Sequence, residues 1–401
     1  MIFQKCQIVD MYNLRNNHFV GIAMLLGLFV PHTSVLLMAI NPLLTALLFV
    51  FVRRREKSGF GVMKFLICSV IIVSLISSSL FLPHDSYKYI VASVFFMMLM
   101  FFFPFIGQQR IPNIYYYISI GIILFSQLIY LFNLPSIQII IEILYPISET
   151  DLNSFEYMTE NINAGNIFGF RLGGVFRNPN QCARYASLIT AAYLADRSNE
   201  SLRKTGPFIL LALSSVLFTG SRTGLAVISL IIFVFFLRNH SIRKNTKIVL
   251  TITVVTLIIP VFISGSQFVR GFNINQGFND SANAKWNVLR DYLAQDNSSF
   301  HLLFGYCDAS TFRPSHFGIM SIFDSEYGNL IYCYGLLGFV LVVFFYIKSI
   351  RVCQKENRLF FLTLLWAITS TILLSFRMSF LFMLFLSHFV SSNQISSTVQ
   401  R

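Results

Sequence analysis

Arginines at the start of an expected helix are the first residues here whose pattern points to chemistry. In the run RLGGVFRNPN, which covers 171–180, Asn178 stands directly before Pro179. Asn is a favoured helix N-cap and Pro is favoured at the first helical position, so the run predicts a helix that begins at Pro179. The N–H groups at a helix start attract anions, and Arg177 and Arg184 would lie beside them. A capped helix whose arginines reach the membrane interface explains the same residues.

Two tight turns place further arginines between apolar runs. The sequence TGSRTG at 219–224 sets Arg222 inside a hydrophobic hairpin, and SFRMS at 375–379 does the same with Arg377. Placing an arginine within a membrane costs about 2.5–3.5 kcal/mol on insertion scales, so such residues usually serve a function. A guanidinium fork fits phosphate and carboxylate oxygens. Arg270, at the start of a later polar segment, has the same potential role, and for each of these arginines snorkelling to the interface is the alternative.

A third group of polar residues supplies candidate bases. The run HFGIMSIFDSEYGNLIYCYGLLG at 316–338 holds His316, Asp324 and Glu326 where a loop enters an expected helix. A positioned carboxylate or imidazole can take a proton from an attacking hydroxyl. Acidic residues and Ser325 are also ordinary helix caps, and a lone loop histidine is more often structural. We rank Asp324 first as a base, Glu326 second and His316 third.

The composition indicates that these residues are held by elements in a membrane. The 401 residues are 55% hydrophobic and 12% charged, with a mean hydropathy of +0.67. Soluble domains carry about 25% charged residues, so this chain lacks the polar groups that a water-exposed surface needs. Lipid is the expected solvent, and a helix satisfies its own backbone polar groups there. The predicted fold class is an all-α polytopic membrane protein, a single integral membrane domain over 1–401.

Apolar runs long enough to cross a bilayer recur along the chain. They predict about twelve transmembrane helices, at 19–34, 35–52, 61–82, 88–106, 113–133, 179–196, 207–220, 222–238, 246–264, 326–349, 358–374 and 376–391. Pro31 and Pro42 interrupt the first two, which can instead form a re-entrant pair. Lys and Arg concentrate in alternate connections, which predicts that both chain ends lie in the cytoplasm. The net charge of +13 follows from this bias and needs no nucleic-acid partner.

Ten Lys and Arg residues fall on the outer side against this bias. Snorkelling or pairing with loop carboxylates explains Lys88, Lys285 and Arg313. The other seven, all arginines, are candidates for binding an anion at the outer face: Arg171, Arg177, Arg184, Arg222, Arg270, Arg290 and Arg377. The six Cys residues stand singly, without the spacing of metal ligands, so no metal is expected.

Two outer segments, 134–178 and 265–325, are too long to be mere connections. The second contains DSANAKWNVLRDYLAQ, in which Trp286, Leu289 and Leu293 fall on one face at helical spacing. This pattern predicts a helix on the membrane surface or over an outer cavity. Aromatic residues of these segments, such as Phe272, Trp286 and Tyr306, are candidates to stack on sugar rings.

The motifs RLGGVFRNPNQ, SRTG, LLFGY and DSEYGNLIYCYGLLG resemble, in their order and spacing, those of the O-antigen polymerase and O-antigen ligase superfamily. The resemblance covers about 165–345. It implies a glycosyltransferase of the GT-C type at the outer face of the bacterial cytoplasmic membrane, the inner membrane, with undecaprenyl-pyrophosphate-linked oligosaccharide as donor. Ligases of the superfamily usually have His-Asn where the large loop re-enters the membrane. This chain has Asp324-Ser325 instead, which favours the polymerase branch.

The resemblance also implies roles for the singled-out residues. Arg177, Arg222 and Arg270 would bind the pyrophosphate, supported by Arg184, Arg171, Arg290 and Arg377, and stabilise the charge that develops on it without a metal or other cofactor. Asp324, Glu326 or His316 would activate the acceptor hydroxyl, with Arg222 completing the catalytic set. Membrane lipids and a chain-length regulator protein are further expected partners.

Several other functions remain open from the sequence. The ligase branch would transfer the glycan to lipid A-core, and a protein O-oligosaccharyltransferase belongs to that branch. A lipid-linked oligosaccharide flippase has a similar helix count, but a transporter should carry polar residues through its central helices and have short outer loops. A receptor or a purely structural protein is the least specific alternative.

Overall fold

The structure, a computed structural model, is helical over most of the residues that it describes. The described residues are 17–30, 40–52, 60–81, 87–102, 111–145, 172–176, 178–239, 299–305, 326–353, 355–368 and 376–391. Within these ranges there is no strand, which confirms the all-α class for this part of the chain.

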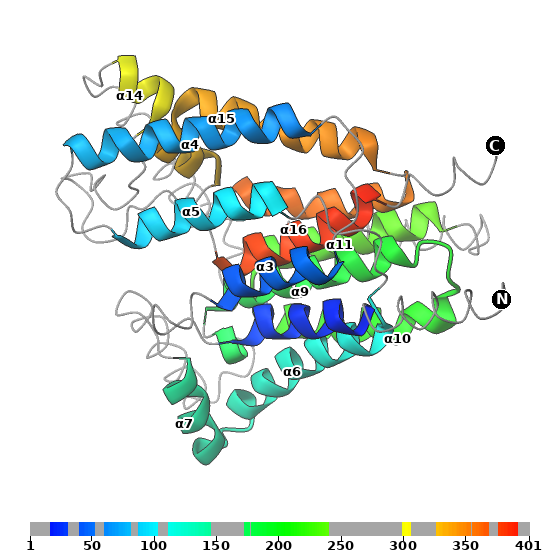
Figure 1. The fold of residues 1–401 in the computed structure, drawn as a ribbon. Coiled ribbons are helices and arrows are strands. Elements are labelled where there is room, and N and C mark those ends of the chain that lie inside the picture. Colours follow the sequence, from blue (N-terminus) through cyan, green and yellow to red (C-terminus); the bar gives the residue numbers. More distant parts are fainter. Residues whose placement is uncertain are drawn as a thin grey trace, which may run out of the picture. The chain divides into compact units, whose positions relative to one another are not determined.

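Figure 1 labels the described helices, which belong to two compact units. Unit 1 comprises 1–115, 288–354 and 367–401, and unit 2 comprises 116–287 and 355–366. The helices of unit 1 are Asn17–Phe29, α3 (Ile40–Val52), α4 (Gly61–Phe81), α5 (Tyr87–Phe102), α14 (Ser299–Phe304), α15 (Glu326–Val352) and α16 (Phe376–Ser391). Those mainly in unit 2 are α6 (Asn113–Leu131), α7 (Pro135–Leu144), η2 (Gly174–Phe176), α9 (Pro179–Asp196), α10 (Leu202–Phe218), α11 (Arg222–Arg238) and the 3-10 helix η4 (Glu356–Ile368).

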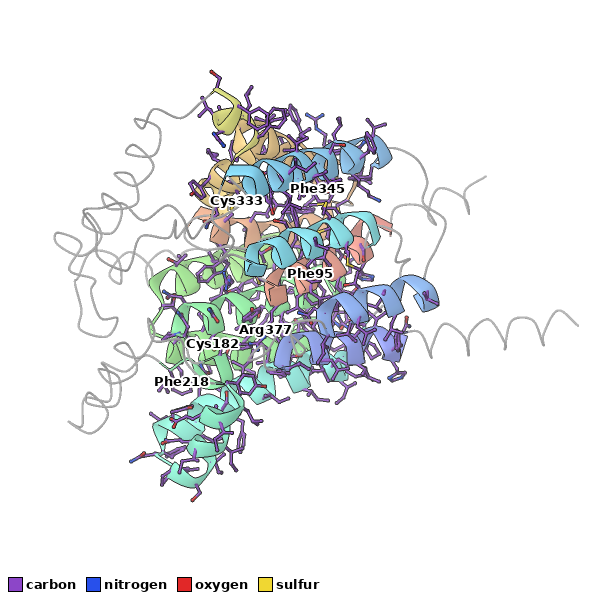
Figure 2. The ribbon with its side chains drawn as sticks, turned by 60° about the vertical axis from the view of Figure 1, so that its left-hand side comes forward. Phe95, Cys182, Phe218, Cys333, Phe345 and Arg377 are labelled. Carbon is purple, nitrogen blue, oxygen red and sulfur yellow. The ribbon has the colours of Figure 1, made fainter. Side chains whose placement is uncertain are left out.

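In unit 1, α15 packs against α4 and α14, while α5 packs against α3, α4 and α16. Figure 2 labels Phe95 on α5 and Phe345 on α15, two of the buried aromatic residues of this unit. The hydroxyls of Ser93 and Tyr334 lie 2.8 Å apart, and the ring of Phe96 stacks on Tyr334 with centroids 6.1 Å apart. These contacts join α5 to the first half of α15.

Helix α9 is the centre of unit 2 and packs against α10, α11 and η2. Every residue from Cys182 to Ala195 is buried. Its polar side chains turn back onto the helix: Ser187 donates to the carbonyl of Ala183 at 2.7 Å and Thr190 to that of Ala186 at 2.6 Å. Such bonds satisfy hydroxyls inside a packed unit without a partner from another helix.

Helix α9 and the strongly apolar helices differ in how far their side chains are covered. Among the described helices of 16 or more residues, α9 is the least hydrophobic, yet it is deeply buried. The strongly apolar helices leave large side chains uncovered, with exposed fractions of 70% at Val50, 75% at Val62 and 64% at Phe65. Small and hydroxyl residues inside, with apolar residues outside, are typical of helices packed in lipid.

Two described helices are long and apolar enough to cross a bilayer, Asn113–Leu131 and Tyr327–Val352. The helices Asn17–Phe29, Gly61–Ile76, Thr223–Arg238 and Arg377–Phe389 are apolar but shorter.

Helices α3, α4, α5, α6, α9, α11, α15 and α16 overlap predicted apolar runs, α7 and α14 match no predicted run, and two further runs differ from their predictions. Helix α10 begins at Leu202, earlier than the predicted 207, because Pro207 is accommodated inside the helix instead of starting it. The run predicted at 358–374 forms a 3-10 helix over Glu356–Ile368 within the described part. The predicted run at 246–264 and the predicted surface helix at 280–295 lie outside the described residues.

Sequence reasoning missed α7 altogether. It assigned 134–178 to an outer segment without naming a helix there, whereas Pro135–Leu144 is helical. The run PSIQIIIEIL is too short to cross a bilayer and follows the preceding apolar run after only three residues, so pattern reasoning merged it with the polar segment beyond it.

Candidate functional site

The motif segment before α9 is fixed by contacts with two neighbouring helices. The N–H of Leu172 donates to the carbonyl of Phe218 at the end of α10, at 2.9 Å. The N–H of Val175 donates to the hydroxyl of Ser126 on α6 at 3.1 Å. Gly174 has a φ of +55°, and a Cβ at this position would collide with the Ser126 hydroxyl. The second glycine of RLGGVFR thus has a structural reason, because the backbone at Gly174 must approach α6 closely.

Gln127 on α6 ties the same segment to the rest of unit 2, and sequence reasoning missed it. Its buried Nε2 lies 3.1 Å from the carbonyl of Leu172 and 2.8 Å from that of Ser215 on α10. It also lies 3.4 Å from Sγ of Cys182 on α9. The signal was present: an amide in the middle of a long apolar run is expensive in lipid unless it is bonded within the protein.

The predicted start of α9 is confirmed. Asn178 is the N-cap, and its Oδ1 accepts from the N–H groups of Asn180 at 2.9 Å and Gln181 at 3.2 Å. Pro179 is the first helical residue, where its missing N–H matters least. Helix α9 therefore has a well-defined N-terminus, two residues after Arg177 in the sequence.

Helix α11 begins with a second cap, in the SRTG turn. Gly220 has a φ of +57°, and the Ser221 hydroxyl accepts from the N–H of Gly224 at 3.2 Å. The hydroxyl of Thr219 accepts from the N–H of Ser221 at 3.1 Å. The turn thereby reverses the chain in four residues and makes Arg222 the first residue of α11.

The two helix starts lie side by side in unit 2. A Cβ on Gly224 would lie 2.6 Å from the Cβ of Ala183, so the two backbones approach closely at this point. Gly224 is the third residue of α11 and Ala183 the fifth of α9. Both helices therefore begin at the same end of the unit, and the positive ends of their dipoles reinforce each other there.

Arg184 and Arg222 belong to these adjoining helix starts. Arg184 follows Ala183 and is only 3% exposed, with its guanidinium carbon 5.7 Å from the centroid of the Tyr185 ring. The ring of Phe176 stacks on Tyr185 with centroids 4.5 Å apart. The stacked rings thus link the segment before Arg177 to the turn of α9 that carries Arg184. Two adjoining helix N-termini, with Arg222 as the first residue of α11 and Arg184 as the sixth residue of α9, form an arrangement suited to binding an anion.

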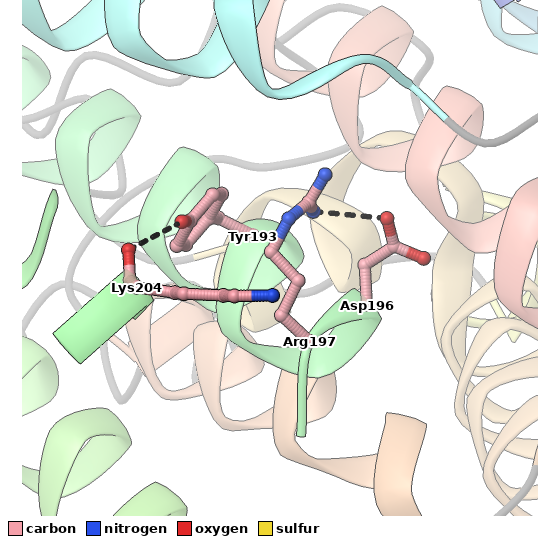
Figure 3. A network of polar contacts seen from close by, with 4 residues as sticks. All are labelled: Tyr193, Asp196, Arg197 and Lys204. Carbon is pink, nitrogen blue, oxygen red and sulfur yellow. Dashed lines mark hydrogen bonds and ion pairs between the residues drawn. The ribbon is translucent and has the colours of Figure 1, made fainter. Parts of the chain in front are cut away.

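The opposite end of α9 carries a different arginine, in a paired network (Figure 3). Nη1 of Arg197 lies 2.9 Å from Oδ2 of Asp196, and its guanidinium carbon is 4.5 Å from the ring centroid of Tyr193. The Tyr193 hydroxyl donates to the carbonyl of Lys204 on α10 at 3.5 Å. This buried ion pair with its aromatic neighbours joins α9 to α10 and has a structural role.

In unit 1, the LLFG and YGLLG motifs contact each other through their backbones. Gly305 and Gly335 have φ values of +76° and +67°. A Cβ on Gly305 would meet the carbonyl group of Cys333, and one on Gly335 would meet that of Leu303. Only glycine permits backbones to lie this close, so the two motifs are recognisable in sequence because they fit each other.

Gly335 also interrupts α15, and α4 compensates for the interruption. The φ of 67° and ψ of −178° at Gly335 are not helical. The break takes the carbonyl of Cys333 (labelled in Figure 2) out of the regular bonding pattern, and the hydroxyl of Ser74 on α4 donates to it at 2.6 Å. An irregular backbone at membrane depth is tolerated where the protein supplies such partners.

The remaining predicted site residues are placed as follows. Glu326 is the first residue of α15, directly after the segment that carries His316 and Asp324. Nη2 of Arg377 on α16 (labelled in Figure 2) donates to the carbonyl of Val30 at 2.7 Å, just beyond the helix that ends at Phe29. The candidates that lie outside the described residues are Arg171, Arg177, Arg270, Arg290, His316 and Asp324.

His301 on α14 is a titratable residue beside the LLFG motif that sequence reasoning passed over. Partial burial lowers the pKa of this imidazole, because it disfavours the charged form. Within the described segments, no group of three or more His, Cys, Asp or Glu is placed to hold a metal ion.

No protein-family model and no curated protein matches this chain.

Proposed function

We propose that this chain is a polysaccharide polymerase of the bacterial cytoplasmic membrane. It would cross the membrane about twelve times with both ends in the cytoplasm. Acting at the outer face, it would transfer a glycan from undecaprenyl pyrophosphate to the acceptor sugar of another lipid-linked repeat unit. The product is an O-antigen or a related polymer. The uncovered apolar helices and the buried, weakly hydrophobic α9 support the membrane part of the proposal.

The observation that carries the proposal is the pair of adjoining helix starts with Arg184 and Arg222. Attack of the acceptor hydroxyl on the anomeric carbon forms the new glycosidic bond and breaks the bond to the pyrophosphate oxygen. Negative charge grows on that oxygen, and helix N–H groups together with arginine guanidinium groups can stabilise such charge. Arg177 and Arg270 are assigned to the same role, with Arg171, Arg290 and Arg377 as further candidates.

The acceptor proton passes to a base in the segment that leads into α15. A positioned carboxylate or imidazole contributes about 10²–10⁴-fold to such a step. Asp324 is the first candidate, followed by Glu326 and His316. Separate Asp324→Asn, Glu326→Gln and His316→Gln variants identify the base, because its replacement removes most of the turnover while donor binding persists.

The proposal is tested with purified protein and a single polyprenyl-pyrophosphate-linked repeat unit, in the absence of lipid A-core. A ladder of products that grow by one repeat unit is the expected result. Transfer only after lipid A-core is added would instead assign the chain to the ligase branch. Movement of the intact lipid-linked unit across vesicles, without any new bond, would assign it to transport.

A further inference from the structure

Helix α7 is held at a fixed angle to the end of α6. Asn133 has a φ of 49°, the N–H of Leu134 donates to the carbonyl of Ile129 at 3.1 Å, and that of Asn133 to Tyr130 at 3.2 Å. These bonds form a Schellman motif, which closes α6 and reverses the chain. Nε2 of Gln138 then reaches back to the Ile129 carbonyl at 3.2 Å. Figures 1 and 2 both show α7 turning off sharply from α6.

The outer face of α7 is a bare aliphatic surface. Ile139, Ile140 and Ile143 lie on one face of the helix and are 54%, 55% and 73% exposed. Gln138 and Glu142 share another face, one helical turn apart, and the helix contains no Lys or Arg. A helix of 10 residues spans about 15 Å, half the thickness of the hydrocarbon layer, so α7 cannot cross a bilayer.

The bare face of α7 continues a lipid-facing row on α6. The exposed residues Ile114, Ile118, Ile122 and Phe125 follow one another at helical spacing along α6, a candidate membrane span. Phe132, 68% exposed, lies in the turn where this row meets α7. The exposed apolar face of α7 is purely aliphatic, whereas the central residues of protein–protein interfaces are enriched in Trp, Tyr and Arg. Both observations favour a bilayer over a protein as its occupant.

The inner side of α7 reaches the motif segment. Ile141, the only buried residue of the helix, packs in a cluster with Ile129, Tyr130 and Leu172. Leu172 is bonded to Phe218, directly before the TGSRTG turn. The depth of α7 in the membrane would therefore set the depth of the segment that leads to Asn178 and α9.

We infer that α7 is an interfacial anchor, with its isoleucine face seated at the boundary between headgroups and acyl chains of the outer leaflet. Short helices with one apolar face bind membranes in this way. Through Ile141 and Leu172, the anchor holds the starts of α9 and α11 at the level of lipid headgroups, where the phosphates of a lipid-linked substrate lie. The inference rests on the proposed membrane placement, but not on glycosyl transfer.

The test is photocrosslinking in the full-length protein, reconstituted in vesicles of phosphatidylethanolamine and phosphatidylglycerol. The photoreactive amino acid p-benzoyl-phenylalanine is placed at Ile143, at Phe125 on the exposed row of α6, and at Asn199 in the turn between α9 and α10. Mass spectrometry of the irradiated protein then identifies what each position touches. The expected result is a mass shift of one phospholipid at Ile143 and Phe125, and no such adduct at Asn199.

Other results at Ile143 overturn the inference. An adduct with the 146–171 segment or with a second copy of the chain identifies a protein occupant. An unreacted probe at Ile143, together with a lipid adduct at Phe125, shows that the isoleucine face of α7 lies in water. A lipid adduct at Asn199 as abundant as at Ile143 shows that the labelling does not select the face. Absence of lipid at Phe125 also removes the membrane placement on which the inference depends. Since no sugar substrate is used, a lipid adduct on a protein without polymerase activity leaves the anchor standing while the proposed function fails.

Discussion

Arginines at the two ends of α9 have different surroundings. Arg197 is 3% exposed, is paired with Asp196 and lies beside the rings of Tyr193 and Tyr116. Arg184 is equally buried, but it stands beside the two capped helix starts and the SRTG turn. A buried ion pair such as that of Arg197 has a structural role, and helix N-termini such as those near Arg184 favour anions.

We expect Arg222→Ala to abolish polymer formation at an unchanged protein level. Removing a single donor to a developing oxyanion costs about 10²–10³-fold in rate. The measurement is product-ladder formation per amount of folded protein in the membrane fraction. Arg203→Gln is the matched control, because Arg203 is exposed at the start of α10 and should retain full activity. Equal losses of activity and protein level in Arg222→Ala would give Arg222 a structural role instead.

Arg197→Ala should show the opposite pattern. Removing one partner of a buried ion pair leaves Asp196 uncompensated, which destabilises a protein by about 3–5 kcal/mol. We expect a lower protein level and a lower melting temperature, with near-normal activity per folded molecule. Normal stability together with lost activity would contradict the structural role given to the network in Figure 3.

At the scale of elements, glycines decide which helices touch. Gly224 brings the start of α11 against α9, and Gly335 breaks α15 so that the LLFG motif can approach it. Neither contact involves a large apolar side chain, so hydrophobic periodicity carries no sign of it. Each contact can be tested by a Gly→Ala substitution, which adds one methyl group.

Gly224→Ala should separate the starts of α9 and α11. Its Cβ would lie 2.6 Å from that of Ala183, closer than side chains pack, so α11 must shift. We expect turnover to fall more than stability, because the arginines on the two helices would move apart. Gly206→Ala on α10 is the control, since its Cβ would meet nothing within 4 Å. Unchanged donor affinity and turnover in Gly224→Ala would argue against a shared anion site.

Gly335→Ala should destabilise unit 1. Its backbone conformation is one that only glycine adopts readily, at a penalty of about 1–3 kcal/mol for other residues, and its Cβ would also strike the Leu303 carbonyl. Thermal unfolding in detergent measures the loss. Gly121→Ala on α6 should do the reverse and stabilise by about 0.5–1 kcal/mol, because its Cβ enters open space in a helix. Matching melting temperatures for the two variants would show that the break at Gly335 is not required.

At the scale of the whole molecule, the placement of charge predicts how the chain lies in the membrane. In a background with Cys6 and Cys307 replaced by Ser, an impermeant maleimide should label cysteines at Tyr145 and Asn297 from outside intact cells. Cysteines at Arg55 and Asn199 should react only after the membrane is opened. Cys68, Cys182, Cys333 and Cys353 are buried and should stay unlabelled. Labelling of Asn199 and Asn297 from the same side would contradict the predicted topology.

The sequence by itself predicted most of the long described helices and the start of α9. Long runs of mainly apolar residues located α4, α9, α11 and α16, because the length and composition of a run are local properties of the sequence. The order Asn178-Pro179 predicted the cap of α9, because capping depends on neighbouring residues alone. Local chemistry was enough for both predictions.

Only the tertiary structure decided which segments of the chain contact each other. Gln127 donates to Leu172, which is 45 residues away in the chain. Gly174 lies against Ser126, 48 residues away, and Gly335 lies against Leu303, 32 residues away. The attachment of α7 through Ile141 likewise joins residues from separate segments. The type of a residue can indicate that it needs a close backbone approach or a hydrogen-bonding partner. It does not indicate which segment provides that contact, because packing brings together segments that lie far apart in the sequence.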